Sequence, residues 1–227
     1  MILEVCCGNI QSVRAAVEGG AQRVELCRDL ELDGLTPDRQ MISQAIAVCH
    51  PAGVRVHVLV RPRAGDFVYS AAEMEQMLAD IRMAVELGAD GIVIGALTAG
   101  GDIDVVQTEQ MIRYARQCCG DRQLGITFHR AFDVCRNSFQ ALEQIIRLGC
   151  DRILTSGQQP TAEQGIPLLK ELVRKANGRI IILCGAGVTP ANAARILHET
   201  GATELHGSLR TGPITDPEKV TWLIHNA

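Results

Sequence analysis

The sequence predicts an α/β fold made of one domain, a (β/α)8 TIM barrel that spans residues 1–227. Three observations predict it: eight short β-rich runs, a helical pattern after each run, and one strand-entry motif that occurs four times. An open doubly wound sheet is the alternative. The even spacing of the eight units counts against it, as does the lack of a G-x-G-x-x-G motif after the first run.

The β-rich runs are short and carry many branched apolar residues, as buried strands do. They are expected at residues 2–6, 23–27, 54–61, 91–95, 124–129, 152–155, 180–184 and 204–206. Between them lie segments in which apolar residues recur at helical spacing, so each run is expected to be followed by a helix.

Capping patterns predict where several of these helices begin. Ser70 and Glu73 have the spacing of a capping box. The helix after them has apolar positions at Met74, Met77, Leu78, Ile81 and Val85. Three further starts are predicted where a capping residue precedes a proline, at Thr36-Pro37, Thr189-Pro190 and Asp216-Pro217.

The repeated motif consists of a helix end, a glycine, a small residue, a polar residue and then a strand. It reads GGAQRVELC, LGADGIVIG, LGCDRILTS and TGATELHGS, with the helix-closing glycines at 20, 88, 149 and 201. Successive copies are separated by two βα units, so the repeat marks the even-numbered strands of a fourfold barrel. Each glycine is expected to adopt a left-handed conformation that ends the preceding helix.

Composition excludes several classes of protein. Hydrophobic residues make up 47% of the chain, charged residues 21%, and the net charge of −4 gives no basic surface for nucleic acid. No apolar run approaches the roughly 20 residues of a membrane span, and MILEVCCGNI does not resemble a signal peptide. A cytoplasmic protein is therefore expected, and its nine cysteines are expected to be reduced. Barrels of this size commonly pair, so a homodimer is expected.

Polar residues occur at alternate positions of the predicted strands, where side chains point into the barrel. They include Glu4, Cys6, Glu25, Cys27, His57, Arg61, Thr127, His129, Glu204, His206 and Ser208, with Arg63, Arg130, Asp133 and Ser156 at or just beyond strand ends. Barrel enzymes place their chemistry at the carboxyl ends of the strands, so this set predicts a site there. Glu4 and Glu25 are expected to pair with Arg61 and Arg63. The alternative is a closed ion network that only stabilises the barrel.

Glycine-bearing turns follow the last two strands, in CGAGV and HGS. Loops at these positions of a barrel often bind phosphate through backbone N–H groups. Gly185 and Gly187 are therefore candidates for anion binding, although both glycines also suit plain turns that begin a helix.

Cys6 and Cys27 lie on the first two strands. If these strands are adjacent and parallel, the two thiols occupy matching positions about 4.8 Å apart. Such a pair suits Cu(I), a soft ion of low coordination number, and a disulfide is disfavoured in a reducing compartment. A closed zinc site lacks four convergent ligands. Buried, inert cysteines are an equally good interpretation of the spacing alone.

Several motifs together resemble the CutC family of copper homeostasis proteins. They are RPRAGDFVYS at 61–70, TFHRAFD at 127–133, LTSG at 154–157 and the N-terminal LEVC…RVELC. The resemblance covers nearly the whole chain and implies a (β/α)8 barrel, cytoplasmic copper handling and Cu(I) ligands at Cys6 and Cys27. The segment LRTGPITDPEKV after the last strand is shorter than is usual in the family, which weakens the case for ligand contacts from it.

Two functions follow from these residues. The first is Cu(I) binding through the metal ligands Cys6 and Cys27, with no organic cofactor. The second is an enzyme that acts on a small anionic metabolite, phosphorylated or carboxylated. Its catalytic candidates are His129, Asp133, Glu4 and Glu25, and its ligand-binding candidates are Arg61, Arg63, Arg130, Ser156, Gly185, Gly187, His206 and Ser208.

Overall fold

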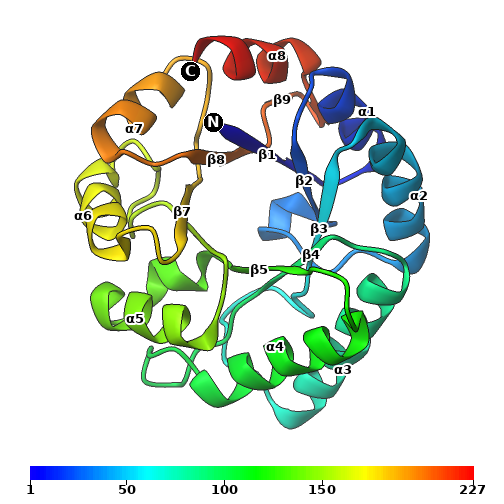
Figure 1. Ribbon diagram of the computed structural model, residues 1–227, viewed down its shortest axis with the longest axis vertical. Helices are drawn as coiled ribbons and strands as arrows, with labels where there is room; N and C mark the ends of the chain where they lie inside the picture. Colours follow the sequence, from blue (N-terminus) through cyan, green and yellow to red (C-terminus); the bar gives the residue numbers. More distant parts are fainter.

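The computed structural model describes residues 1–227 and contains a closed barrel of eight parallel strands, which pair in the order β1 to β8. The main helices surround the barrel as an outer ring (Figure 1). The predicted TIM barrel is therefore confirmed. None of the helices has the length and apolar character that crossing a membrane would require.

The strands and helices alternate along the chain. The barrel strands are β1 Ile2–Cys7, β2 Arg23–Leu26, β3 Arg55–Leu59, β4 Gly91–Ile94, β5 Gly125–Phe128, β6 Arg152–Thr155, β7 Ile181–Cys184 and β8 Glu204–Gly207. The α-helices are α1 Ile10–Glu18, α2 Arg39–Cys49, α3 Ala71–Glu86, α4 Val105–Cys119, α5 Ser138–Leu148, α6 Ile166–Ala176, α7 Ala193–Thr200 and α8 Pro217–Asn226. Short 3-10 helices lie at η1 Leu30–Leu32, η2 His50–Ala52 and η3 Arg130–Val134, and β9 Arg210–Thr211 pairs with β10 Ile214–Thr215.

All eight predicted strands are present, with ends within two residues of those observed. The four glycines of the repeated motif have the expected left-handed conformation, with φ of +85° at Gly20, +102° at Gly88, +78° at Gly149 and +73° at Gly201. Each lies between the end of a helix and the start of the next strand, so the repeat marks the helix-to-strand turns that precede the even-numbered strands.

Two of the four predicted helix starts are confirmed. Ser70 and Glu73 form a capping box, and Asp216 caps α8 with proline in its first turn. The start at Thr36 is wrong, because Asp38 caps α2 and the Thr36 hydroxyl instead bonds the backbone of Arg61.

The start predicted at Thr189 is also wrong. The Asn192 side chain accepts a hydrogen bond from the Thr189 backbone, forming a turn, and α7 begins only at Ala193. In both wrong cases the proline lies in the approach to the helix, outside its first turn.

The lower interior of the barrel is filled by an ion network. The Arg23 guanidinium donates to the carboxylates of both Glu4 and Glu204, and Arg152 Nε donates to Glu204 at 3.0 Å. All four side chains are buried. Two carboxylates and two guanidiniums therefore neutralise one another where barrels usually hold apolar side chains. The closed-network interpretation holds for this layer.

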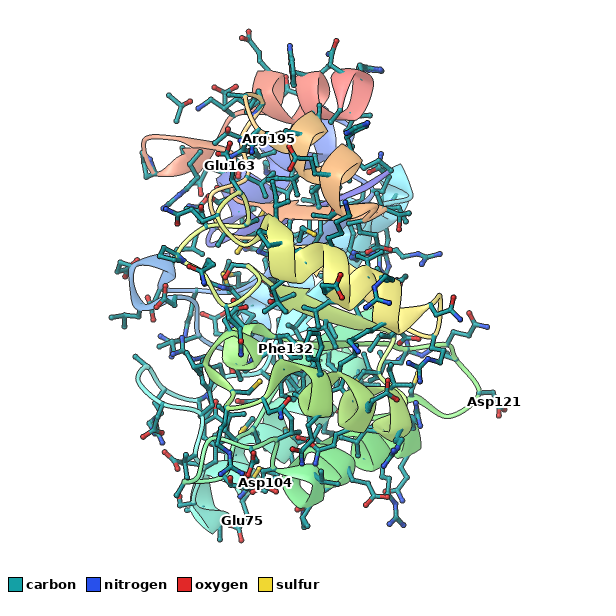
Figure 2. All side chains as sticks on the ribbon, turned by 90° about the vertical axis from the view of Figure 1, so that its left-hand side faces the viewer. Glu75, Asp104, Asp121, Phe132, Glu163 and Arg195 are labelled. Carbon is teal, nitrogen blue, oxygen red and sulfur yellow. The ribbon has the colours of Figure 1, made fainter.

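The two ends of the barrel differ, as Figure 2 shows from the side. Glu163, in the segment after β6, lies toward one end, and Asp121, in the turn before β5, projects at the other. The segments after the strands lie at the carboxyl end of the barrel, above the ion network, and this end holds the candidate site.

Replacing Arg23 by methionine tests the role of the network. We expect Arg23→Met to lower the free energy of unfolding by about 3–5 kcal/mol, because it leaves Glu4 and Glu204 buried without their shared partner. Urea denaturation of the variant and the parent measures this. Arg174→Ala is the control, because its pair with Glu171 is exposed and should contribute little. Equal stability of Arg23→Met and the parent would contradict a structural role for the network.

Candidate functional site

A pocket of about 1090 Å³ opens at the carboxyl ends of the strands. Among the predicted site residues, Cys6, Glu25, Arg61, His129, Arg130, Asp133, Gly187, His206 and Ser208 line it. Glu4, Cys27, Arg63, Ser156 and Gly185 do not. Leu30 and Asp33 cover one side, from the light-blue segment after β2 that lies across the barrel opening in Figure 1.

Cys6 lies at one wall of the pocket with Cys27 behind it, and their Sγ atoms are 3.7 Å apart. The expectation that they occupy matching positions is wrong. The neighbour of Cys6 across the strand pair is Glu25, and Cys27 lies two residues further along. The stagger between adjacent barrel strands causes this difference, and the two thiols meet diagonally.

The two thiols belong to a small apolar cluster that is separate from the main core. Leu59 and Val93 complete it, with Leu30 packed against it. Cys27 is fully buried, whereas Cys6 reaches the pocket. The hydrogen bond with the Cys27 thiol, together with burial, raises the pKa of Cys6 well above its ordinary value. Cys6 is therefore a thiol at neutral pH, and a metal ion that binds it must displace a proton.

His206 lies between two carboxylates. Its Nδ1 atom is 2.8 Å from Glu4 Oε1, and its Nε2 atom is 3.7 Å from Glu25 Oε2. Burial by itself would lower the pKa of His206, but the Glu25 charge, the Cys6 thiol and the hydrogen bond to Glu4 raise it well above its ordinary value.

The two glutamates on either side of His206 differ in their surroundings. Burial would raise the pKa of Glu4, but Arg23 and His206 outweigh it and hold this pKa well below the usual range. Burial raises the pKa of Glu25, the charge of His206 opposes the rise and the Glu4 carboxylate adds to it. Glu4 is therefore the fixed anion of the pair, and Glu25 is the carboxylate with spare capacity for a ligand.

The expected pairing of Glu4 and Glu25 with Arg61 and Arg63 is not found. Arg23 and His206 take these positions because they point inward in the same layers as the glutamates. Arg23 was missed as a partner although it continues the alternation of Glu25 and Cys27 by one step toward the start of the strand.

Arg61 is buried without any carboxylate partner. Its Nη1 atom donates to the carbonyls of Leu32 and Gly34, and its Nη2 atom donates to that of Gly65. Its Nε atom has no partner, and Phe67 packs with its ring centroid 5.1 Å from the guanidinium carbon. Arg61 thus supplies an uncompensated positive charge to the wall of the pocket.

Arg63 organises the loop after β3 and does not enter the pocket. It pairs with Asp66 at 2.9 Å, contacts Glu73, and donates to the carbonyl of Val68 at 2.8 Å. The two arginines of this motif therefore have different roles. Arg61 places a cation at the pocket, and Arg63 holds the loop after β3 in its conformation.

His129 is a neutral imidazole on the pocket wall. Its Nδ1 atom accepts a hydrogen bond from the Ala131 backbone at 3.1 Å, so the ring proton lies on Nε2, which has no partner. Burial lowers the pKa of His129 to about 3, and the charge of Arg61 adds to this. Gly95 leaves the space for the ring, because a Cβ atom there would lie 2.6 Å from it.

Asp133 is the centre of a hydrogen-bonded turn. It contacts the Thr155 hydroxyl, accepts from the Ser156 backbone at 3.0 Å and hydroxyl at 3.0 Å, and pairs with Arg130 Nε at 2.8 Å. Its carboxylate is thereby occupied by donors within the chain. Asp133 and Ser156 hold the segments after β5 and β6 together. Arg130 pairs with Asp133 through Nε and also lines the pocket.

The loop after β7 contains three residues at the pocket whose backbone N–H groups have no partner within the chain. These residues are Ala186, Gly187 and Val188. Gly187 has φ of +68°, a left-handed conformation that favours glycine. Gly185 instead packs beneath the pocket, where a Cβ atom would lie 2.6 Å from Leu154.

The segment after β8 lines the pocket, although it was not expected to contact a ligand because it is short. Leu209, Arg210, Gly212 and Lys219 line the opening, along with Ser208. These contacts arise because β9 and β10 fold the segment back as a hairpin. Phe67 and the two cations of this segment were not among the predicted site residues, and no periodic pattern marks them.

Comparison with known proteins identifies relatives along most of the chain. The profile of the CutC family matches residues 1–211. A CutC family protein of Bacteroides fragilis is 54% identical over 209 residues, which cover 92% of this chain and 80% of that protein. The crystal structure of the putative copper homeostasis protein CutC from Streptococcus agalactiae superposes with a TM-score of 0.85 at 36% identity, covering 92% of this chain and 98% of that one. Thiamine phosphate pyrophosphorylase from Pyrococcus furiosus (TM-score 0.65, 16% identity, covering 99% and 94%) shares the fold alone.

The state of the interior histidines can be checked by pH titration. Burial lowers the pKa of His57, like that of His129, to about 3. Between pH 6.5 and pH 3 the unfolded chain binds protons that the folded chain does not, so each histidine lowers the free energy of unfolding as the pH falls. We expect this loss at about 1.4 kcal/mol per pH unit for each histidine, and none above pH 6.5. NMR of the imidazole nitrogens should show both rings neutral at pH 5, and titration near pH 6.5 would contradict this assignment.

Proposed function

The chain belongs to the CutC family, and from this premise we propose that it handles copper in the cytoplasm by binding Cu(I) through Cys6 and Cys27. One observation carries the proposal: the Sγ atom of Cys6, at the wall of a large pocket, lies 3.7 Å from the Sγ atom of the buried Cys27. A thiol pair selects Cu(I) because soft sulfur ligands prefer soft ions.

The surroundings of the two thiols support a soft cargo ion. Leu59 and Val93 pack against them, so one side of the thiol pair is apolar. Access runs through Cys6, which is 7% exposed, whereas Cys27 is fully buried. We infer that copper enters from the pocket, contacts Cys6 first and displaces thiol protons as it binds.

Anaerobic Cu(I) titration against a competing chelator tests this site. We expect the parent protein to bind one tight equivalent and the Cys6→Ala/Cys27→Ala double variant to lose it, because Cys6 is the only cysteine that lines the pocket and Cys27 is the thiol in contact with it. Cys7→Ala is the matched control, since Cys7 is next to Cys6 but packs into the main core. Equal Cu(I) affinity in the parent and the double variant would refute the two-thiol site.

A second candidate function, an enzyme of small anionic metabolites, is favoured by a different observation. Arg61 is 5% exposed and has no carboxylate partner, although a buried cation normally requires one. Gly187 and Val188, whose backbone N–H groups have no partner within the chain, line the same pocket. At about 1090 Å³ the pocket suits a metabolite rather than an ion alone. A carboxylate or phosphate group would compensate the charge of Arg61.

Thermal shift with a panel of phosphorylated and carboxylated metabolites tests this second function. We expect at least one anion to raise the melting temperature, and Arg61→Ala to abolish that shift because it removes the unpaired cation. Arg174→Ala is the control and should keep the shift, because Arg174 lies on α6 outside the pocket and pairs with the exposed Glu171. Circular dichroism checks that each variant is folded. If no anion shifts the parent protein, the metabolite site is rejected.

A further inference from the structure

The carboxylate of Glu25 is unusual among the buried acidic groups of this protein. It is 4% exposed, and no N–H group donates a hydrogen bond to it. The only basic side chain within 4 Å is His206, whose Nε2 atom lies 3.7 Å away, beyond hydrogen-bond distance. By contrast, Glu4 and Glu204 each receive guanidinium donors. The Glu25 oxygen atoms are therefore free of guanidinium and backbone donors, and His206 is the only cationic side chain beside them.

His206 is oriented in the way that metal-binding histidines are. Its Nδ1 atom is held by Glu4 Oε1 at 2.8 Å, and Glu4 is itself fixed by Arg23. This leaves Nε2 directed toward Glu25 and the pocket. A carboxylate behind one ring nitrogen and a free second nitrogen is the usual arrangement around histidine ligands, because the carboxylate fixes the ring and increases its basicity.

Cys6 supplies a third ligand atom on the same side. Cys6 Sγ, a Glu25 carboxylate oxygen and a ring nitrogen of His206 all lie within 4.8 Å of one another. Cys27 is not part of this group. All three residues line the pocket, so the side of the cluster away from the barrel floor is open.

We propose that Cys6, Glu25 and His206 form a binding site for one divalent transition-metal ion of the zinc class, with its remaining coordination position facing the pocket. Sulfur, nitrogen and carboxylate oxygen together suit Zn²⁺, and three protein ligands with one open position is the pattern of catalytic rather than structural zinc. The site is distinct from the Cu(I) pair because it uses Glu25 and His206 in place of Cys27. It does not rest on the copper function.

Titration of the chelator-treated protein with Zn²⁺ against a chromogenic chelator tests the site, and Co²⁺ gives a spectroscopic readout of the thiolate ligand. We expect one equivalent of Zn²⁺ and a sulfur-to-cobalt charge-transfer band in the parent protein. Removing an outer carboxylate behind a histidine ligand weakens metal binding 10–100-fold, so loss of a direct ligand in Glu25→Gln or His206→Gln should exceed about 100-fold. Cys6→Ala should abolish the charge-transfer band.

Cys27→Ala separates this site from the copper site. It should leave Zn²⁺ affinity nearly unchanged while it weakens Cu(I) binding, and Glu25→Gln should do the reverse. Circular dichroism verifies folding, and Glu25→Asp, which keeps the charge but shortens the side chain, replaces Glu25→Gln if the latter is unfolded. The proposal is overturned if the parent protein does not bind Zn²⁺, if neither Glu25 variant weakens binding, or if Cys27→Ala removes Zn²⁺ and Cu(I) together.

Discussion

The contact of Arg23 with both Glu4 and Glu204 is the interaction on which the rest of the interior depends. It allows three charged strands to meet inside a closed barrel, where unpaired charges would be strongly destabilising. Because Arg23 keeps Glu4 ionised through one carboxylate oxygen, the other oxygen is available to hold Nδ1 of His206. The ordered floor of the pocket is thus a consequence of charge compensation one layer deeper.

Above this floor, the pocket combines groups of different chemistry that the chain leaves uncommitted. The Cys6 and Cys27 thiols offer soft ligands, Glu25 and His206 offer harder ones, and Arg61 offers a positive charge without a partner. Asp133, in contrast, is saturated by donors and serves as a joint between two loops. Side chains without a full set of partners, such as Arg61 and Glu25, are the groups that can bind a ligand. Side chains whose hydrogen-bonding capacity is filled, such as Asp133, maintain the shape of the site.

Sequence reasoning predicted the barrel almost completely, because strand runs, helix spacing and the glycine repeat all follow local rules. The alternation rule also placed Glu4, Cys6, Glu25 and His206 inside the barrel. It did not predict which side chains pair, because partners on neighbouring strands depend on the offset between those strands. Cys6 is opposite Glu25, and Glu4 pairs with Arg23 instead of Arg61. The partners of Arg61 were also not predictable. Its guanidinium donates to backbone carbonyls of loops, and loops have no periodic sequence pattern from which such contacts can be inferred.

In this member of the CutC family, we propose that the diagonal pair of Cys6 and Cys27 captures a soft metal ion that enters through the pocket. X-ray absorption spectroscopy at the copper edge of the Cu(I)-loaded protein tests it most directly, because sulfur and nitrogen or oxygen neighbours scatter differently. A Cu(I) ion held by Cys6 and Cys27 should show two sulfur atoms at bonding distance, and these should be lost in the Cys6→Ala/Cys27→Ala variant. A first shell made only of nitrogen and oxygen atoms would contradict it.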